Sequence, residues 1–220
     1  FIIRAPLGSP LRKWLAKKIA KKRAPQSAEE YASIGFSKIN EMTSLQAQIL
    51  EKELQKYRPK TQVTVVNRYT EPFSETIVKE SNLEDKRVFY LSLYPHLSHT
   101  TTVSAYKKFD DSFRERWGHL DFTSTRIFSW WYQKPYLDYT SEELSLSASR
   151  VLESYPNEPL TILVSAHGLP ESYYLKGDPY IDEIKAHFSE LKERVSNSLK
   201  DKKLIKNKGD ISWNLSFQSR

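Results

Sequence analysis

The chain has 220 residues, a formal net charge of +7, 39% hydrophobic residues and 28% charged residues. These values fit a globular protein of one large or two small domains, and no run of residues is long and apolar enough for a transmembrane helix or a signal-peptide core. The lack of cysteine excludes disulfides, thiolate-bound zinc and iron–sulfur clusters within the chain. We therefore expect a cytoplasmic protein.

The first segment of the chain is strongly basic. Residues 1–24 contain eight basic and no acidic residues, so the net charge of residues 25–220 is −1. Because the body of the protein has no surplus of positive charge, we predict that nucleic acid is not a partner.

Residues 9–24 are predicted to form an amphipathic helix, in which Leu11, Trp14, Leu15 and Ile19 share one stripe. One interpretation is a peripheral membrane contact, with the apolar stripe toward lipid and the lysines toward headgroups. A second is a surface helix packed on its own domain, which needs the same stripe. A basic transit-type leader is a third. We treat residues 1–30 as a separate basic N-terminal segment.

After this segment, helical and strand patterns alternate along the chain. Helices are predicted around residues 45–54, 72–83, 101–117, 144–155 and 181–199. Strands are predicted at residues 63–66, 87–91, 122–128, 160–164 and 211–217. Repeated β-α-β units indicate an α/β fold, in which helices cover the faces of parallel sheets.

The most informative segment is Ser-Ala-His-Gly-Leu-Pro at residues 165–170, directly after the apolar strand at 160–164. His167 is thus expected just past the carboxyl end of a strand, where ligands bind in open α/β folds. Gly168 allows the backbone to turn and to approach a ligand closely. A histidine in this position serves as a base or a metal ligand near neutral pH, so we favour a functional role over a structural one.

The other histidines carry weaker signals. His96 and His99 either line the same crevice or lie in solvated loops. His119 follows a Trp-Gly pair and His187 lies in a charged amphipathic helix, so both are predicted on the surface.

Aromatic residues also follow the predicted strands, and aromatic walls with few polar groups suit a large flat ligand. Of Trp130 and Trp131, we expect one to pack structurally and the other to contact the ligand. Asp178 and Tyr180 are predicted to cap and anchor the following helix. Nucleophile-elbow, zinc-protease and phosphate-loop motifs are absent from the sequence.

At this point the motifs match a family. Residues 165–170, together with Gly-Asp-Pro-Tyr at 177–180, resemble the signature of ferrochelatases, the enzymes that insert ferrous iron into a porphyrin. Further stretches similar to this family follow the family's order, at residues 31–38, 67–73, 93–98 and 217–220. The resemblance extends from about Tyr31 to Arg220.

The resemblance implies an α/β fold of two Rossmann-like, chelatase-like domains with parallel four-stranded sheets. The first domain would cover residues 31–128 and the second residues 129–220. It also implies a fold that is incomplete at both ends, because the family's first strand is not seen. The C-terminal part, which carries a glutamate opposite the histidine, is not seen either.

The resemblance further implies that His167 is the catalytic histidine, which binds incoming iron or accepts pyrrole protons. The chemistry agrees, since such a base needs a pKa near ambient pH and imidazole suits a ferrous ion. The residues implied on the porphyrin side are Ser37, Arg68, Tyr69, Tyr94, Tyr106 and Trp131. Arg68 has the geometry to pair with a propionate. Ferrous iron is a substrate, and we expect no tightly bound cofactor.

Three functions remain open at this stage. The first is a ferrochelatase that acts on protoporphyrin IX or coproporphyrin III. The second is a truncated, porphyrin-binding fragment without catalytic activity. The third is a related tetrapyrrole chelatase that prefers another metal.

Overall fold

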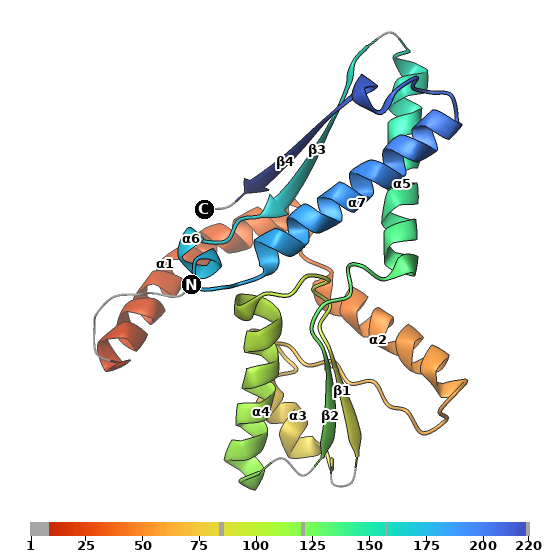
Figure 1. The fold of residues 1–220 in the computed structure, drawn as a ribbon. Coiled ribbons are helices and arrows are strands. Elements are labelled where there is room, and N and C mark those ends of the chain that lie inside the picture. The colour runs from red at the N-terminus through yellow and green to blue at the C-terminus, as the bar shows by residue number, and fades with distance from the viewer. Residues whose placement is uncertain (1–8, 84–85, 120–121, 157, 219–220) are drawn as a thin grey trace. The chain divides into compact units, whose positions relative to one another are not determined.

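The computed structural model describes residues 9–83, 86–119, 122–156 and 158–218 (Figure 1). The chain divides into two compact units, Phe1–Val65 and Val66–Arg220. The domain boundaries predicted after residues 30 and 128 stay predictions.

From residue 9 onward, where its description begins, the first unit has the helices α1 (Ser9–Ser33) and α2 (Ile39–Gln55). The helix predicted at 9–24 therefore continues through Pro25. The strand predicted at 63–66 is wrong, since no β-strand is assigned there within the described ranges. Its β-branched residues have no neighbouring strand to pair with, and the segment is instead held by the main-chain N–H of Val63, which donates to the Glu51 carboxylate at 2.6 Å.

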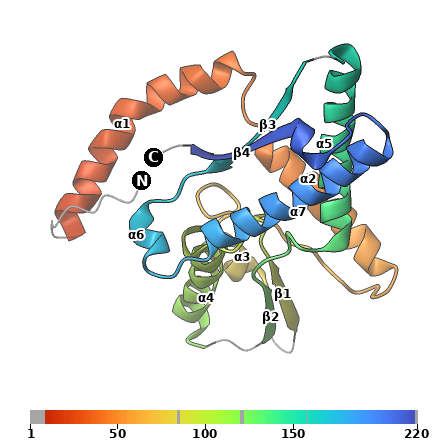
Figure 2. The same cartoon turned by 45° about the horizontal axis from the view of Figure 1, so that its top comes forward.

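The first half of the second unit is built on a parallel strand pair. Strand β1 (Arg87–Leu91) pairs in parallel with β2 (Thr123–Ile127), from Arg87 opposite Thr123 to Leu91 opposite Ile127. A π-helical turn, η1 (His99–Val103), and helix α4 (Ser104–Trp117) connect them, and a short helix, α3 (Ser74–Glu80), precedes them. Helices α3 and α4 lie on one face of the pair (Figure 1, Figure 2). The core between them consists of Val78, Tyr90, Tyr106, Phe109 and Phe113.

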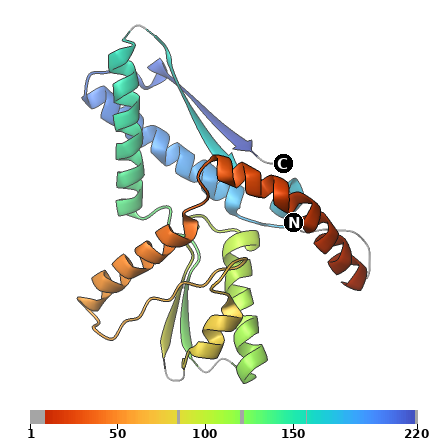
Figure 3. The ribbon, with the colours of Figure 1, turned by 180° about the vertical axis from the view of Figure 1, so that it is seen from behind.

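The second half of this unit repeats the β-α-β arrangement. Its strands, β3 (Leu160–His167) and β4 (Ile211–Gln218), pair in parallel along their whole lengths. Helix α5 (Lys134–Ser154) precedes β3, while α6 (Glu171–Tyr174), α7 (Tyr180–Asp201) and the short η2 (Lys208–Asp210) connect the strands. Helices α5 and α7 cover one face of this pair (Figure 1, Figure 3). The second core consists of Ala148, Ile162, Val195, Leu199, Ile205 and Ile211.

The structure confirms a mixed α/β fold with parallel strands, but not the four-stranded sheets. Among the residues that the structure describes, each sheet has two strands. The uncovered face of each pair exposes apolar residues, with Phe89 60% exposed on one and Leu163 64% exposed on the other. Alternation of side chains along a strand explains this pattern, because only one face packs against helices. No helix across the described ranges has the length and apolar character needed to cross a membrane.

Candidate functional site

His167 stands at the carboxyl end of β3. The strand is longer than predicted, so His167 is its last residue and pairs with Gln218 of β4. The N–H of Gly168 donates to the carbonyl of Gln218, which continues the ladder one step further. The side chain of His167 is exposed, on the same face of the strand as Ser165 and Leu163. This placement leaves the imidazole accessible at the edge where parallel α/β sheets bind ligands.

Two loops meet beyond the carboxyl ends of β1 and β2, because the strands are parallel and end at the same edge. The N–H groups of Trp130 and Trp131 donate to the carbonyl of Pro95, at 2.9 and 3.2 Å. The indole N–H of Trp130 donates to the carbonyl of Ser92 at 2.8 Å. Its ring also packs edge-on against Tyr136. Trp130 therefore has the structural role that the sequence assigned to one of the two tryptophans.

Two histidines from these elements form a direct pair. His96 follows β1, and its Nε2 lies 3.0 Å from Nδ1 of His187 on α7. The ring of Trp131 is stacked against His96, with 6.2 Å between centroids, and lies 5.4 Å from His187. The edge of Tyr180 contacts His96 from another side, at 6.2 Å. His96 thus packs in an aromatic cluster and is not a solvated loop residue.

Both histidines are held neutral by their surroundings. Burial and, to a smaller extent, the neighbouring His187 together lower the pKa of His96 to about 4. Burial also lowers the pKa of His187, although Glu190 partly opposes this. A neutral pair shares one proton, with one nitrogen as donor and the other as acceptor.

The prediction of a surface position for His187 is wrong, because this side chain is only 8% exposed. The sequence contains a signal that reveals this. His187, Leu191, Val195 and Leu199 follow one another at intervals of four residues, and all four are buried. Such spacing places them on one face of a helix, so His187 belongs to the buried stripe of α7.

Asp178 and Tyr180 confirm the predicted anchoring role. The carboxylate of Asp178, which is 1% exposed, accepts from the N–H of Tyr180 at 3.1 Å. It also accepts from the hydroxyl of Ser98 and the N–H of His99, both at 2.9 Å. Asp178 therefore does more than cap α7, since it ties the loop after β1 to the start of that helix.

Tyr106 differs from the expectation for a ligand-binding residue. Its side chain is 7% exposed and belongs to the core beneath β1 and β2. Its hydroxyl lies 2.6 Å from the carbonyl of Ile127 and 3.2 Å from that of Tyr90. The structure gives this tyrosine a packing role, because both its ring and its hydroxyl are engaged inside the protein.

The remaining predicted residues lie in different places. Trp131 is half-buried beside the histidine pair, and Tyr94 is exposed in the same loop as His96. Arg68 stacks over the ring of Tyr69, at 5.4 Å, beside a surface depression of about 330 Å³. This depression is lined by Asn67, Arg68, Phe73, Ser74, Glu75, Thr76 and Lys108. Ser37 belongs to the first unit, where its hydroxyl accepts from the N–H of Ile39.

No described part of the chain brings three or more histidine, aspartate or glutamate side chains together in a way that would hold a metal ion. The prediction that His167 is a metal ligand therefore stays a prediction. So do the roles assigned to Ser37, Arg68, Tyr69, Tyr94 and Trp131.

Comparison with known proteins identifies the family. The ferrochelatase family model matches residues 1–220. A protein named ferrochelatase from Desulfotalea psychrophila is 35% identical over 191 residues, which cover 86% of this chain and 58% of that protein. A protein named ferrochelatase-2, chloroplastic, from Cucumis sativus is 36% identical over 187 residues, covering 83% of this chain and 36% of that protein. The chain spans less than two thirds of the length of these relatives, and it belongs to the ferrochelatase family.

Proposed function

We propose that this chain forms the histidine-bearing part of a ferrochelatase, which inserts ferrous iron into a porphyrin and releases two protons. The porphyrin is protoporphyrin IX or coproporphyrin III. The observation that carries the proposal is the placement of His167 in a chain of this family. It is an exposed imidazole at the carboxyl end of a parallel strand, followed by a glycine.

The chemistry of this reaction explains why an imidazole suits the position. A free porphyrin holds two pyrrole N–H protons, and both must leave as the metal enters. A neutral imidazole near ambient pH accepts such a proton, and the same nitrogen is a good ligand for a ferrous ion before transfer. In this proposal ferrous iron is a substrate, and the chain holds no resident cofactor.

We further propose that each β-α-β unit belongs to a larger Rossmann-like sheet. The exposed apolar residues on the uncovered face of each pair support this, because such faces are normally covered in parallel sheets. Arg68, Tyr94 and Trp131 would contact the porphyrin in this proposal, and their partial or full exposure supports such a contact.

An absorbance titration tests the function. The chain is mixed anaerobically with porphyrin and ferrous iron, and the spectrum is followed over time. A haem spectrum supports the enzyme. A bound free-base spectrum supports a porphyrin-binding fragment without catalytic activity instead. Insertion of another divalent metal in preference to iron would indicate a related chelatase.

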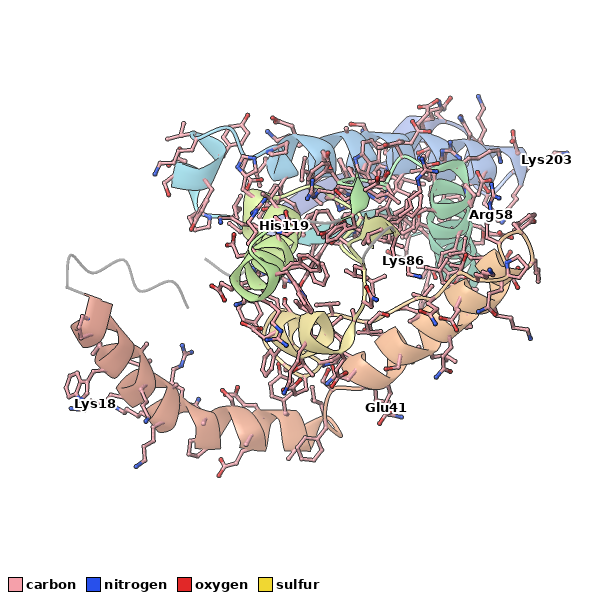
Figure 4. All side chains as sticks on the ribbon, turned by 90° about the horizontal axis from the view of Figure 1, so that it is seen from below. Lys18, Glu41, Arg58, Lys86, His119 and Lys203 are labelled. Atoms are coloured by element: carbon pink, nitrogen blue, oxygen red, sulfur yellow. The ribbon has the colours of Figure 1, made fainter. Side chains whose placement is uncertain are left out.

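The basic helix supports a second, peripheral role at a membrane surface. Within its unit, α1 has no buried side chain among those described, and Trp14 is 58% exposed. Lys18 projects outward from the helix (Figure 4) and lies over the ring of Trp14, at 5.2 Å. An exposed tryptophan among lysines suits an anionic lipid surface.

Flotation with anionic vesicles tests this membrane contact, using the intact chain and a variant with Lys17, Lys18, Lys21 and Lys22 changed to glutamine. Equal flotation of both would contradict the proposal. A cytoplasmic location stays a prediction, and the Cucumis sativus relative is named chloroplastic.

A further inference from the structure

The indole ring of Trp131 packs against both members of the histidine pair. The ring of His96 is nearly parallel to the indole, with 19° between the planes and 6.2 Å between the centroids. The ring of His187 lies 5.4 Å from the same indole, at an angle of 30°. The two imidazole centroids are 5.1 Å apart, so both rings lie to the same side of Trp131. Offset stacking at such distances is favourable for aromatic rings.

The two imidazoles are themselves fixed in place, and we call them the histidine platform. Nε2 of His96 lies 3.0 Å from Nδ1 of His187. Burial keeps both rings neutral by lowering the pKa of each, so one nitrogen donates and the other accepts. Tyr136 contacts His187 from another direction, at 5.6 Å, and the edge of Tyr180 contacts His96 at 6.2 Å. The platform therefore presents a surface of defined orientation.

The side chain of Trp131 depends on this platform for its direction. The N–H of Trp131 donates to the carbonyl of Pro95 at 3.2 Å, which fixes the main chain but leaves two side-chain torsions free. Trp130 differs, because its indole N–H is bonded to the carbonyl of Ser92. Among the described residues, the other ring contact of Trp131 is to Tyr132, its neighbour in the chain, which is 54% exposed.

We propose that His96 and His187 are positioning residues that hold the ring of Trp131 ready to contact the porphyrin. Trp131 is half-buried, so packing on the platform leaves part of this residue accessible to a ligand. A side chain that is already fixed loses little conformational entropy when a ligand stacks on it, which raises the affinity. The inference rests on the proposed function for its ligand, whereas the fixing of the ring is measurable without one.

Four substitutions separate this role from a general loss of structure. His96→Ala and His187→Ala each remove one ring of the platform. His187→Asn places an amide where Nδ1 was, so it keeps the hydrogen bond to His96 without the imidazole. His119→Ala is the matched control, because it removes an exposed histidine after the end of α4. Each is made in the wild-type chain and in a Trp131→Ala chain, which gives double-mutant cycles.

NMR of the indole N–H groups reports the orientation of the ring without any ligand. The signal of Trp131 is assigned by its loss in Trp131→Ala. We expect this signal to shift toward that of free tryptophan in His96→Ala and in His187→Ala, and to stay in place in His119→Ala. The signal of Trp117, which packs against Phe113, should stay in place in every variant. A Trp131 signal that does not shift in either platform variant would overturn the proposal.

Equilibrium binding of metal-free protoporphyrin IX and coproporphyrin III gives the functional readout. We expect His96→Ala and His187→Ala each to raise the Kd by about tenfold, and His187→Asn by about threefold or less. In the Trp131→Ala chain the same changes should alter the Kd by less than about twofold, because no ring is left to position. Equal losses in both chains would overturn the proposal, as would His187→Asn weakening binding as much as His187→Ala.

The two levels of the proposal fail in distinguishable ways. If the wild-type chain binds neither porphyrin, the proposed function fails, and the indole signal alone decides whether the histidines position Trp131. If His187→Ala does not fold, His96→Ala and His187→Asn decide it.

Discussion

Lowering the pH should weaken folding through the buried pair of His96 and His187. Burial lowers the pKa of His96 to about 4 in the folded protein, whereas a histidine in an unfolded chain has a pKa of about 6.5. In the unfolded chain His96 becomes protonated below about pH 6.5, whereas in the folded protein it stays neutral until about pH 4. The free energy of unfolding therefore falls as the pH drops through this window, and is constant above it with respect to this group.

The size of this pH effect on the free energy of unfolding follows from the pKa shift of His96. For a fully buried group, a pKa that moves from about 6.5 to about 4 lowers the free energy of unfolding by about 2 kcal/mol at pH 5. His96 is only partly buried, so solvent screening reduces this to about 1 kcal/mol. Lysine partners lower the pKa of Glu75 and Asp111 from ordinary values of 4.5 and 3.8, so their contribution to stability is lost mainly below about pH 5, outside the pH range measured below.

Urea unfolding monitored by tryptophan fluorescence measures this effect between about pH 7 and about pH 5. His96→Gln should lose most of the pH dependence that His96 contributes, since glutamine does not titrate. His119→Gln, which changes an exposed histidine, should keep the wild-type slope. A wild-type stability that is flat across the window, or an unchanged slope in His96→Gln, would refute the reasoning.

Three further changes test the assignment of structural roles by urea unfolding. Leu199→Ala should lower the free energy of unfolding by about 2–5 kcal/mol, because Leu199 is fully buried in the core beneath β3 and β4. A loss below about 1 kcal/mol would contradict the packing of that core. Tyr106→Phe should lower the free energy of unfolding by about 1 kcal/mol, because the hydrogen bond to the Ile127 carbonyl is lost, while the affinity for porphyrin stays unchanged. Weaker porphyrin binding at full stability would instead support the predicted contact of Tyr106 with the porphyrin. Tyr90→Phe should cost about 1 kcal/mol, because its hydroxyl donates to buried Asp110 at 2.7 Å, and an unchanged stability would argue against that bond.

The amphipathic and apolar patterns of the sequence predicted those helices and strands well that pack one face against a core of the same chain. Strand β1 begins and ends at the predicted residues, and the spacing of Leu191, Val195 and Leu199 predicted α7 correctly. The strand at residues 63–66 failed because a β-branched run forms a strand only when another strand pairs with it. Local propensity does not specify that partner.

The candidate site shows the same division between local and long-range information. The motif around His167 predicted the place of this residue at the end of a strand, since a short local pattern defines it. The contact between His96 and His187 joins residues that are 91 positions apart. The charged surroundings of His187 in the sequence concealed its buried position, and only its four-residue spacing from Leu191 reveals it.

The same limit applies to Asp178. Its position before a helix predicted a cap, and the structure confirms this bond to Tyr180. The bonds to Ser98 and His99 depend on the tertiary arrangement of two loops and could not be inferred from the spacing of residues.

The central claim is that His167 performs the proton or metal step of iron insertion. The most direct test compares the initial rate of anaerobic haem formation by the intact protein with that of His167→Ala, using His119→Ala as the control for loss of an exposed histidine. We predict that His167→Ala loses iron insertion while its circular dichroism and porphyrin binding remain those of the wild type. Normal turnover by His167→Ala would contradict the account.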